Sequence, residues 1–191
     1  MTSDFMQAME AHAENYAQQD KERESIITQS RNILKNAKQA IYALHRGDQQ
    51  QWKDKTAAAK KQVDHMQTLA QADQVGAFRA ALEEYVEALA FAYILREQQL
   101  PTKASLGLED ISTETFLQGL SDCSGELVRK ATAAATAGDD SFVLQCMQLV
   151  QELQEGFLLF DFRGGELRKK SDSLRHNLAK LEKLNYEVSR K

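Results

Sequence analysis

The chain has 191 residues and a net charge of −4, and 42% of its residues are hydrophobic. That apolar content excludes an intrinsically disordered chain and is enough for a packed core. The charge gives no sign of a uniformly basic nucleic-acid-binding protein, and no apolar run approaches the roughly 20 residues that would span a bilayer. We interpret residues 1–191 as one domain with no membrane segment. Because the N-terminus lacks the basic and apolar blocks of a signal peptide, we expect a cytoplasmic protein.

The composition favours long helices. There are only one proline and nine glycines, and the common residues are strong helix formers. No β-hairpin signal and no internal repeat is present. The sequence therefore predicts an all-α bundle of about six or seven helices. The predicted helices, in chain order, span about 4–46, 48–72, 74–100, 113–137, 141–160 and 167–188.

The first helix has a short apolar line at seven-residue spacing, formed by Ile27, Leu34 and Ile41. Ser30 interrupts this line, which favours a seam inside a bundle over a free coiled coil. The apolar pattern weakens before Glu24, and we expect about the first ten residues to fray.

Breakers and caps set the predicted boundaries. Gly47 is a typical stop before a capping aspartate, and Gly138 ends the fourth long helix. Pro101 ends the third helix, and 101–111 is predicted to be the longest irregular connection. Thr113 is the predicted cap of the helix that follows.

The two cysteines, Cys123 and Cys146, have neither redox nor zinc-binding spacing. We interpret them as reduced thiols in a helical core. A disulfide between them stays open, because spacing does not show proximity.

One acidic pair lies in the third helix. Glu84 and Glu87 are three residues apart and therefore share a helix face. Phe91 and Ile94 continue the same line. A face that mixes acids with large apolar groups is less stable in water than a plain polar face, which indicates an enclosed site.

A second pair lies in the fourth long helix, where Asp122 and Glu126 are four residues apart. Gly119 and Gly125 flank them, although each glycine costs a helix about 1 kcal/mol relative to alanine. Small residues around paired carboxylates indicate a surface that another group approaches closely, with a cation between the acids. Two such helices could form a four-carboxylate cluster, whose hard oxygen ligands suit Mg²⁺ or Mn²⁺ rather than zinc. The alternative is that the acids are solvated surface groups.

The sequence around the two pairs, at 84–88 and 119–127, resembles the acidic motifs of translin-associated factor X, the catalytic branch of the translin family. The similarity continues at 155–157, 167–175 and 180–188. It covers most of the chain from about Ile26 and is strongest after Leu82. It implies a translin-like fold and a single-chain member of prokaryotic or archaeal type.

The resemblance also implies a function, namely Mg²⁺-dependent endonucleolytic cleavage of single-stranded RNA inside a homo-oligomer, an octamer or a hexamer. The implied catalytic residues are also the implied ligands of Mg²⁺ or Mn²⁺. They are Glu84, Glu87, Asp122 and Glu126. No histidine lies in either motif, so a metal-bound hydroxide or one of the acids is expected to act as the base.

Alternatives remain open. A translin-like oligomer could bind single-stranded RNA, and single-stranded DNA as well, without cleaving it. A helical scaffold with no nucleic-acid role is a third interpretation. Whether a separate partner chain is needed is also open.

Basic residues concentrate near the C-terminus, where 163–191 holds nine Lys or Arg and four Asp or Glu. This asymmetry permits a local basic surface on an acidic protein, although a solvated terminal helix explains it equally simply. The candidate nucleic-acid-binding residues are Arg79, Arg129, Arg168, Lys169, Lys170 and Arg175.

Overall fold

The structure is a computed structural model, and it describes residues 3–69 and 72–190. Every regular element within these residues is helical, which confirms the predicted all-α fold. The elements are α1 (Asp4–Arg46), α2 (Gln49–Gln67), the 3₁₀ turn η1 (Ala72–Gln74), α3 (Gly76–Glu97), α4 (Lys103–Leu106), α5 (Thr113–Ala137), α6 (Asp140–Phe157) and α7 (Gly165–Val188).

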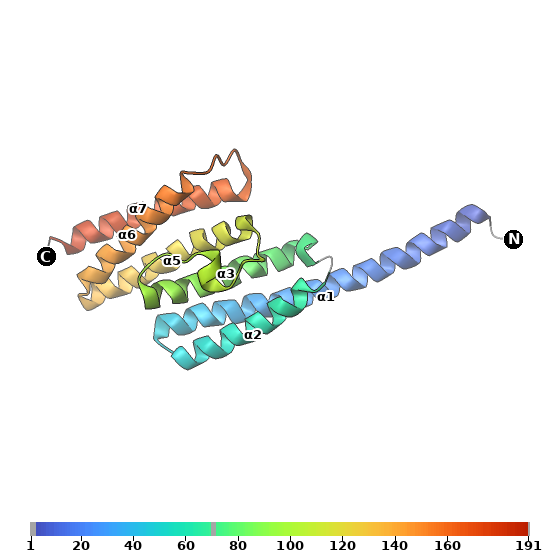
Figure 1. The fold of residues 1–191 in the computed structure, drawn as a ribbon, viewed down its shortest axis with the longest axis horizontal. Coiled ribbons are helices and arrows are strands. Elements are labelled where there is room, and N and C mark those ends of the chain that lie inside the picture. The colour runs from blue at the N-terminus through green and yellow to red at the C-terminus, as the bar shows by residue number, and fades with distance from the viewer. Residues whose placement is uncertain (1–2, 70–71, 191) are drawn as a thin grey trace.

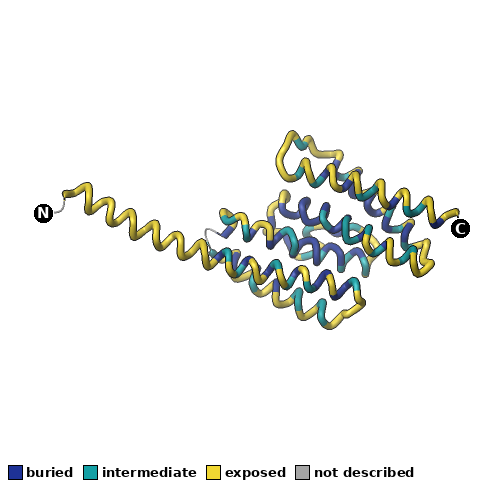
Figure 2. The backbone as a smooth tube through the Cα atoms, turned by 180° about the vertical axis from the view of Figure 1, so that it is seen from behind, coloured by how far each residue is buried: buried dark blue, intermediate teal, exposed yellow. Residues whose placement is uncertain are grey.

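The long helices pack side by side, with α3 and α5 in the middle (Figure 1). One side of α3 contacts α1, and its other side contacts α5. Helix α2 covers α1, while α7 and α6 cover α5. Figure 2 shows the consequence, since buried residues concentrate in the two central helices. The two predicted acidic helices are therefore direct neighbours at the centre of the bundle.

Gly119 makes the closest approach between α3 and α5. A Cβ atom at this position would lie 2.6 Å from Cβ of Val86 and 2.8 Å from the backbone oxygen of Glu83. Gly125 is different, because a Cβ there would meet Nδ2 of Asn177 at an ordinary 3.8 Å. The close contact between α3 and α5 therefore accounts for a glycine at position 119, but no such contact accounts for the glycine at position 125.

Helix α1 begins at Asp4, where fraying had been expected, and the Ser3 hydroxyl accepts a hydrogen bond from the Met6 amide at 3.3 Å. Residues 3–25 are exposed, and this half of α1 extends away from the bundle (Figures 1 and 2). Burial starts at Ile26. No helix among the described residues combines the length and the apolar character needed to cross a membrane.

The predicted seam of α1 is confirmed at Ile41, which is buried, and is shifted by one residue in the two preceding turns of the pattern. There Ile26 and Ile33 are buried, whereas the predicted Ile27 and Leu34 are only partly buried. Ser30 lies inside the seam because its hydroxyl donates to the backbone oxygen of Ile26 at 2.7 Å, which satisfies the buried polar group.

Several predicted boundaries were wrong. Ser112, not Thr113, caps α5, since its hydroxyl accepts from the Thr115 amide at 3.1 Å. The connection after Pro101 is not wholly irregular, because a capping box between Thr102 and Ser105 starts the single turn of α4. Helices α2, α3 and α6 end three to five residues earlier than predicted, and α7 starts at the second glycine of its break.

Both cysteines are free and buried, in agreement with the predicted reduced thiols. Burial raises the pKa of the Cys146 thiol to about 12 and that of Cys123 well above its ordinary value, so neither is a ready nucleophile.

Candidate metal and nucleic-acid site

The four predicted acids lie on the facing helices α3 and α5. Glu87 is buried, with 8% of its surface exposed, while Glu84, Asp122 and Glu126 are partly exposed. A pocket of about 200 Å³ lies beside them. It is lined by Lys38, Ile41, Tyr42, Glu84, Glu87, Glu126 and Arg129.

Glu87 is the most perturbed carboxyl of this group. Burial, followed by the negative charges of Glu84, Asp122 and Glu126, raises the pKa of Glu87 to about 9. At neutral pH this carboxyl therefore retains its proton, and its surroundings favour added positive charge. The negative charges of three acids thus act on the fourth, because the two predicted acidic pairs lie near each other.

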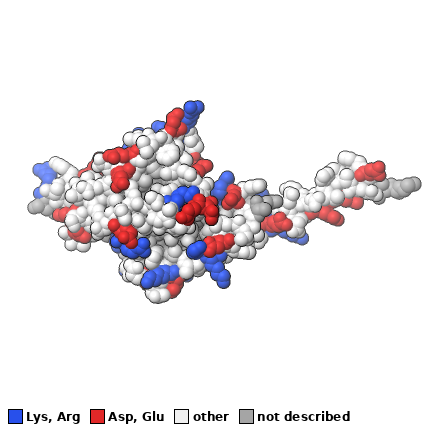
Figure 3. Space-filling model, viewed as in Figure 1, with Lys and Arg blue, Asp and Glu red and all other residues white. Residues whose placement is uncertain are grey.

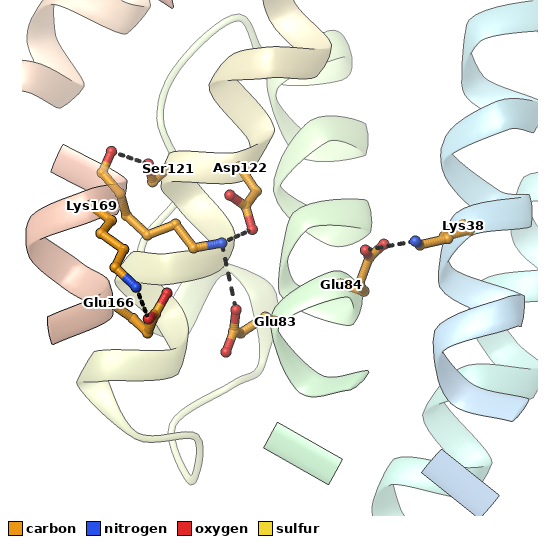
Figure 4. Close-up of polar contacts among 8 residues, drawn as sticks. Lys38, Glu83, Glu84, Ser121, Asp122, Glu166 and Lys169 are labelled. Atoms are coloured by element: carbon orange, nitrogen blue, oxygen red, sulfur yellow. Dashed lines mark hydrogen bonds and ion pairs between the residues drawn. The ribbon is translucent and has the colours of Figure 1, made fainter. Parts of the chain in front are cut away.

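A lysine of α1 faces Glu84. The Lys38 Nζ lies 3.3 Å from Oε1 of Glu84, as Figure 4 shows. Burial raises the pKa of Glu84, and the Lys38 charge opposes that rise. Lys38 was not predicted, because it lies more than 40 residues before its partner.

A lysine of α7 bridges two acids on the opposite side. Lys170 donates a hydrogen bond to Oδ2 of Asp122, and its Nζ lies 3.6 Å from Oε2 of Glu83. Burial lowers the pKa of Lys170, but the hydrogen bond to Asp122 and the charges of both acids raise it more. Lys170 was predicted to contact nucleic acid, and the structure instead directs it at carboxylates of the same chain. Glu83 was not predicted as part of the site.

Glu126 is bound by a histidine. Nε2 of His45, at the end of α1, hydrogen-bonds to Oε2 of Glu126, and Arg129 Nη1 lies 3.7 Å from the same oxygen. Burial lowers the pKa of His45, although Glu126 opposes that shift. The two residues are 81 positions apart, so the spacing within the acidic motifs could not reveal this contact. The identity of the general base stays a prediction.

The donor chemistry fits Mg²⁺ or Mn²⁺, because carboxylate oxygens are the preferred ligands and the buried Glu87 lies among three other acids. However, no three His, Cys, Asp or Glu side chains in the described part of the chain lie close enough together to hold a metal ion. The carboxylates of Glu84, Asp122 and Glu126 face protein cations instead. Metal binding would require these side chains to turn toward Glu87.

The remaining candidate nucleic-acid residues are exposed, and several form local ion pairs. Nε of Arg168 lies 3.5 Å from Oδ2 of Asp172, and Nζ of Lys169 lies 2.6 Å from Oε1 of Glu166. Arg79 and Arg175 are exposed on α3 and α7. On the face drawn in Figure 3, positive and negative side chains are interspersed. Contact of these residues with nucleic acid stays a prediction.

The sequence profile of the translin family matches residues 21–190. The chain belongs to the translin family. Chicken (Gallus gallus) translin is 30% identical over 145 residues, which are 68% of this chain and 63% of that protein. Human (Homo sapiens) translin is 30% identical over 123 residues, or 59% of this chain and 54% of that protein. The matched part thus spans between half and two thirds of these translins.

An uncharacterized protein of Methanocaldococcus jannaschii is similar over a longer part. It is 29% identical over 171 residues, which are 87% of this translin-family chain and 76% of that protein.

Solved structures have the same fold. The apo-NeC3PO crystal structure superposes with a TM-score of 0.78 at 24% identity and covers 98% of both chains. AfC3PO superposes with a TM-score of 0.80 at 18% identity, covering 95% of this chain and 97% of that one. AfC3PO is also known in a complex with duplex RNA. At these identities the similarity shows the fold alone, so the activity of this translin-family chain has to be argued from its own residues.

Proposed function

We propose that this translin-family protein is a Mg²⁺-dependent endoribonuclease of the catalytic branch, acting on single-stranded RNA within a homo-oligomer. One observation carries the proposal. The buried Glu87 carboxyl, with its pKa raised to about 9, has three acids around it and lines a pocket that also holds Lys38 and Arg129. Such a combination of clustered acids and adjacent cations is typical of a site that binds a metal ion and a phosphate.

The ligands of the ion would be Glu84, Glu87, Asp122 and Glu126. When bound, Mg²⁺ lowers the pKa of a coordinated water and offsets negative charge on the scissile phosphate. Once Glu84 turns from Lys38, that lysine is free to bind a phosphate oxygen. Arg129, stacked 5.1 Å above the Tyr42 ring, is held at the pocket edge, where its planar guanidinium can orient the phosphate.

The family relatives and the small volume of the pocket support the proposed substrate class. AfC3PO has been crystallised with duplex RNA, which supports RNA as the ligand of this relative too. The pocket has a volume of about 200 Å³ and suits the groups of an RNA backbone better than a base. We therefore expect only a slight sequence preference. Single-stranded RNA is the proposed substrate, and duplex RNA is the comparison. An octamer or a hexamer of one chain is proposed from the family resemblance.

The test is cleavage of end-labelled single-stranded RNA in Mg²⁺. Wild-type protein and the exposed-acid control Glu152→Gln on α6 should cleave. Glu126→Gln and Asp122→Asn should lose about 10²-fold or more in rate, because each removes a ligand charge. Equal cleavage by wild type and Glu126→Gln would remove this site from the mechanism.

The second candidate is a non-catalytic oligomer that binds single-stranded RNA or DNA. The observation in its favour is that Lys38, His45 and Lys170 already face the carboxylates of Glu84, Glu126 and Asp122. Such a protein would show salt-sensitive RNA binding with no metal-dependent cleavage.

A further inference from the structure

A second pocket lies between α2, α3 and the connection that contains α4. Its volume is about 470 Å³, against about 200 Å³ for the pocket beside Glu87. The two pockets have no lining residue in common. The larger one is therefore a separate feature of the molecule, and its size is typical of a site for a small organic ligand.

One wall of the larger pocket is apolar and fixed. It includes Tyr85 of α3 and, after α4, Leu108 and Ile111, and all three are buried. The backbone amide of Leu108 donates to the Lys103 oxygen at 2.9 Å, which ties the connection to the start of α4. Because this wall is held by core packing and by backbone hydrogen bonds, the pocket is formed before any ligand enters.

Two polar atoms of α2 beside the pocket are unpartnered. Nε1 of Trp52 and Oγ1 of Thr56 are buried, and neither has a hydrogen-bond partner within the described part of the chain. The two residues are four apart on one face of α2, and both line the pocket. A buried polar group without a partner is costly in free energy. A ligand acceptor that reaches the indole N–H after a side-chain rotation would remove that cost.

Charged side chains of both signs also line this pocket. Lys53 and Lys60 come from α2, while Asp64 and Asp110 supply two carboxylates. Nζ of Lys60 lies 2.8 Å from Oδ2 of Asp64, so part of the charge is already balanced. Two lysines against two aspartates disfavour a simple anion or cation. They fit a neutral ring whose edge both donates and accepts hydrogen bonds.

We propose that this pocket binds one nucleobase, either of a free nucleoside or of a single-stranded RNA. A base has apolar faces, and its edge carries ring acceptors and amino donors. Its faces would lie against the Trp52 indole and the apolar wall, and its edge would meet Asp64 or Asp110. A phosphate attached to it would lie near Lys53. The inference goes beyond the proposed function, because it needs no metal ion and no cleavage.

The test uses the fluorescence of Trp52, which is the only tryptophan of the chain. The probes are adenosine, a single-stranded oligoadenylate and an abasic strand of the same length, all in EDTA. Ala57→Phe fills the pocket from an exposed position of α2. Ala58→Phe is the matched control, because Ala58 is also exposed on α2 but does not line the pocket.

Oligoadenylate should quench the Trp52 fluorescence of wild type and of Ala58→Phe in a saturable manner. Ala57→Phe should bind at least about tenfold more weakly, which is the effect of losing one stacked base. Ala57→Leu, a smaller filler, keeps the test valid if the Phe variant fails to fold. Quenching by adenosine as well would show that a free nucleoside suffices, whereas quenching by the oligoadenylate alone would show that the base has to be part of a strand.

Three results would overturn the inference. One is that neither adenosine nor oligoadenylate changes the Trp52 fluorescence of the folded wild type at millimolar concentration. Another is that the abasic strand quenches as strongly as the oligoadenylate, since the backbone would then be the ligand. The third is equal affinity of the folded Ala57 and Ala58 variants. Glu126→Gln should bind oligoadenylate as wild type does, so a failure of the proposed cleavage site is distinguishable from a failure of this pocket.

Discussion

At the scale of single residues, the buried Glu87 makes stability depend on pH. Its pKa is about 9 in the folded protein, against 4.5 for the ordinary value, so the folded state retains a proton that the unfolded state loses. At pH values between these two pKa values, the unfolded chain binds fewer protons than the folded chain. The contribution of Glu87 to stability is therefore lost as the pH rises. Without metal, the wild-type protein should become less stable from about pH 5 to about pH 9.

Glu87→Gln should remove that dependence, because the amide is neutral at every pH. In EDTA at about pH 8, the variant should be more stable than wild type by about 1–4 kcal/mol, measured by urea unfolding. Glu152→Gln, at an exposed position, should keep the wild-type pH profile. A Glu87→Gln profile that falls with pH as steeply as wild type would show that Glu87 is not the buried acid responsible.

Lys170 supports a second prediction at this scale. Lys170→Met keeps the apolar stem and removes the ammonium, leaving Asp122 and Glu83 without their shared partner. We expect a loss of about 1–2 kcal/mol in unfolding free energy, reduced by solvent screening of the partly exposed acids. Lys169→Met, whose ion pair with Glu166 is exposed, should change it by less than about 0.5 kcal/mol. Equal effects of the two substitutions would contradict a structural role for Lys170.

The shared helix faces of the acids could be predicted from sequence, and the partners of these acids on other helices could not. Spacing alone places Glu84 with Glu87 and Asp122 with Glu126 on shared faces. Lys38, His45 and Lys170 come from other helices, between 46 and 81 residues away from Glu84, Glu126 and Asp122. The spacing of Lys38, Tyr42 and His45 in the sequence does place them on one face of α1. That spacing indicates partners for the acids only once this face is known to contact α3 and α5.

At the scale of elements, the contact between α3 and α5 determines where the acidic helices meet. Gly119→Ala should destabilise the protein by about 1–3 kcal/mol, because the new Cβ would be within 3 Å of Val86 and of the Glu83 backbone. Gly125→Ala should be neutral or stabilising by up to about 1 kcal/mol, since its Cβ meets only an ordinary contact. Thermal denaturation of the two variants checks this directly. Equal destabilisation by both would contradict the described helix crossing.

The long helices could be predicted because their apolar periodicity extends over many turns. Helix α4, at Lys103–Leu106, has too few residues to show a period, and its capping box is evident only with coordinates. Ser30 was predicted to interrupt the seam of α1, but it is buried in that seam because its hydroxyl donates to the backbone oxygen of Ile26 in the preceding turn.

At the scale of the whole molecule, the N-terminal half of α1 lies outside the bundle. Phe5, Met9 and Tyr16 are exposed along it, and burial begins only at Ile26. Deleting residues 1–20 should therefore change the unfolding free energy of the remaining chain by less than about 1 kcal/mol, measured by urea unfolding with light scattering to record the assembly state. A loss above about 2 kcal/mol would show that this segment packs against protein.

The whole bundle places two acidic helices at its centre, with α1 and α7 supplying cations from either side. We propose that α3 and α5 together bind a divalent ion for RNA cleavage. The most direct measurement is anomalous diffraction from a crystal soaked in Mn²⁺. A peak within about 2.5 Å of carboxylate oxygens of Glu87 and at least one of Glu84, Asp122 and Glu126 is the predicted result. Mn²⁺ bound elsewhere, with no anomalous density between α3 and α5, would contradict it.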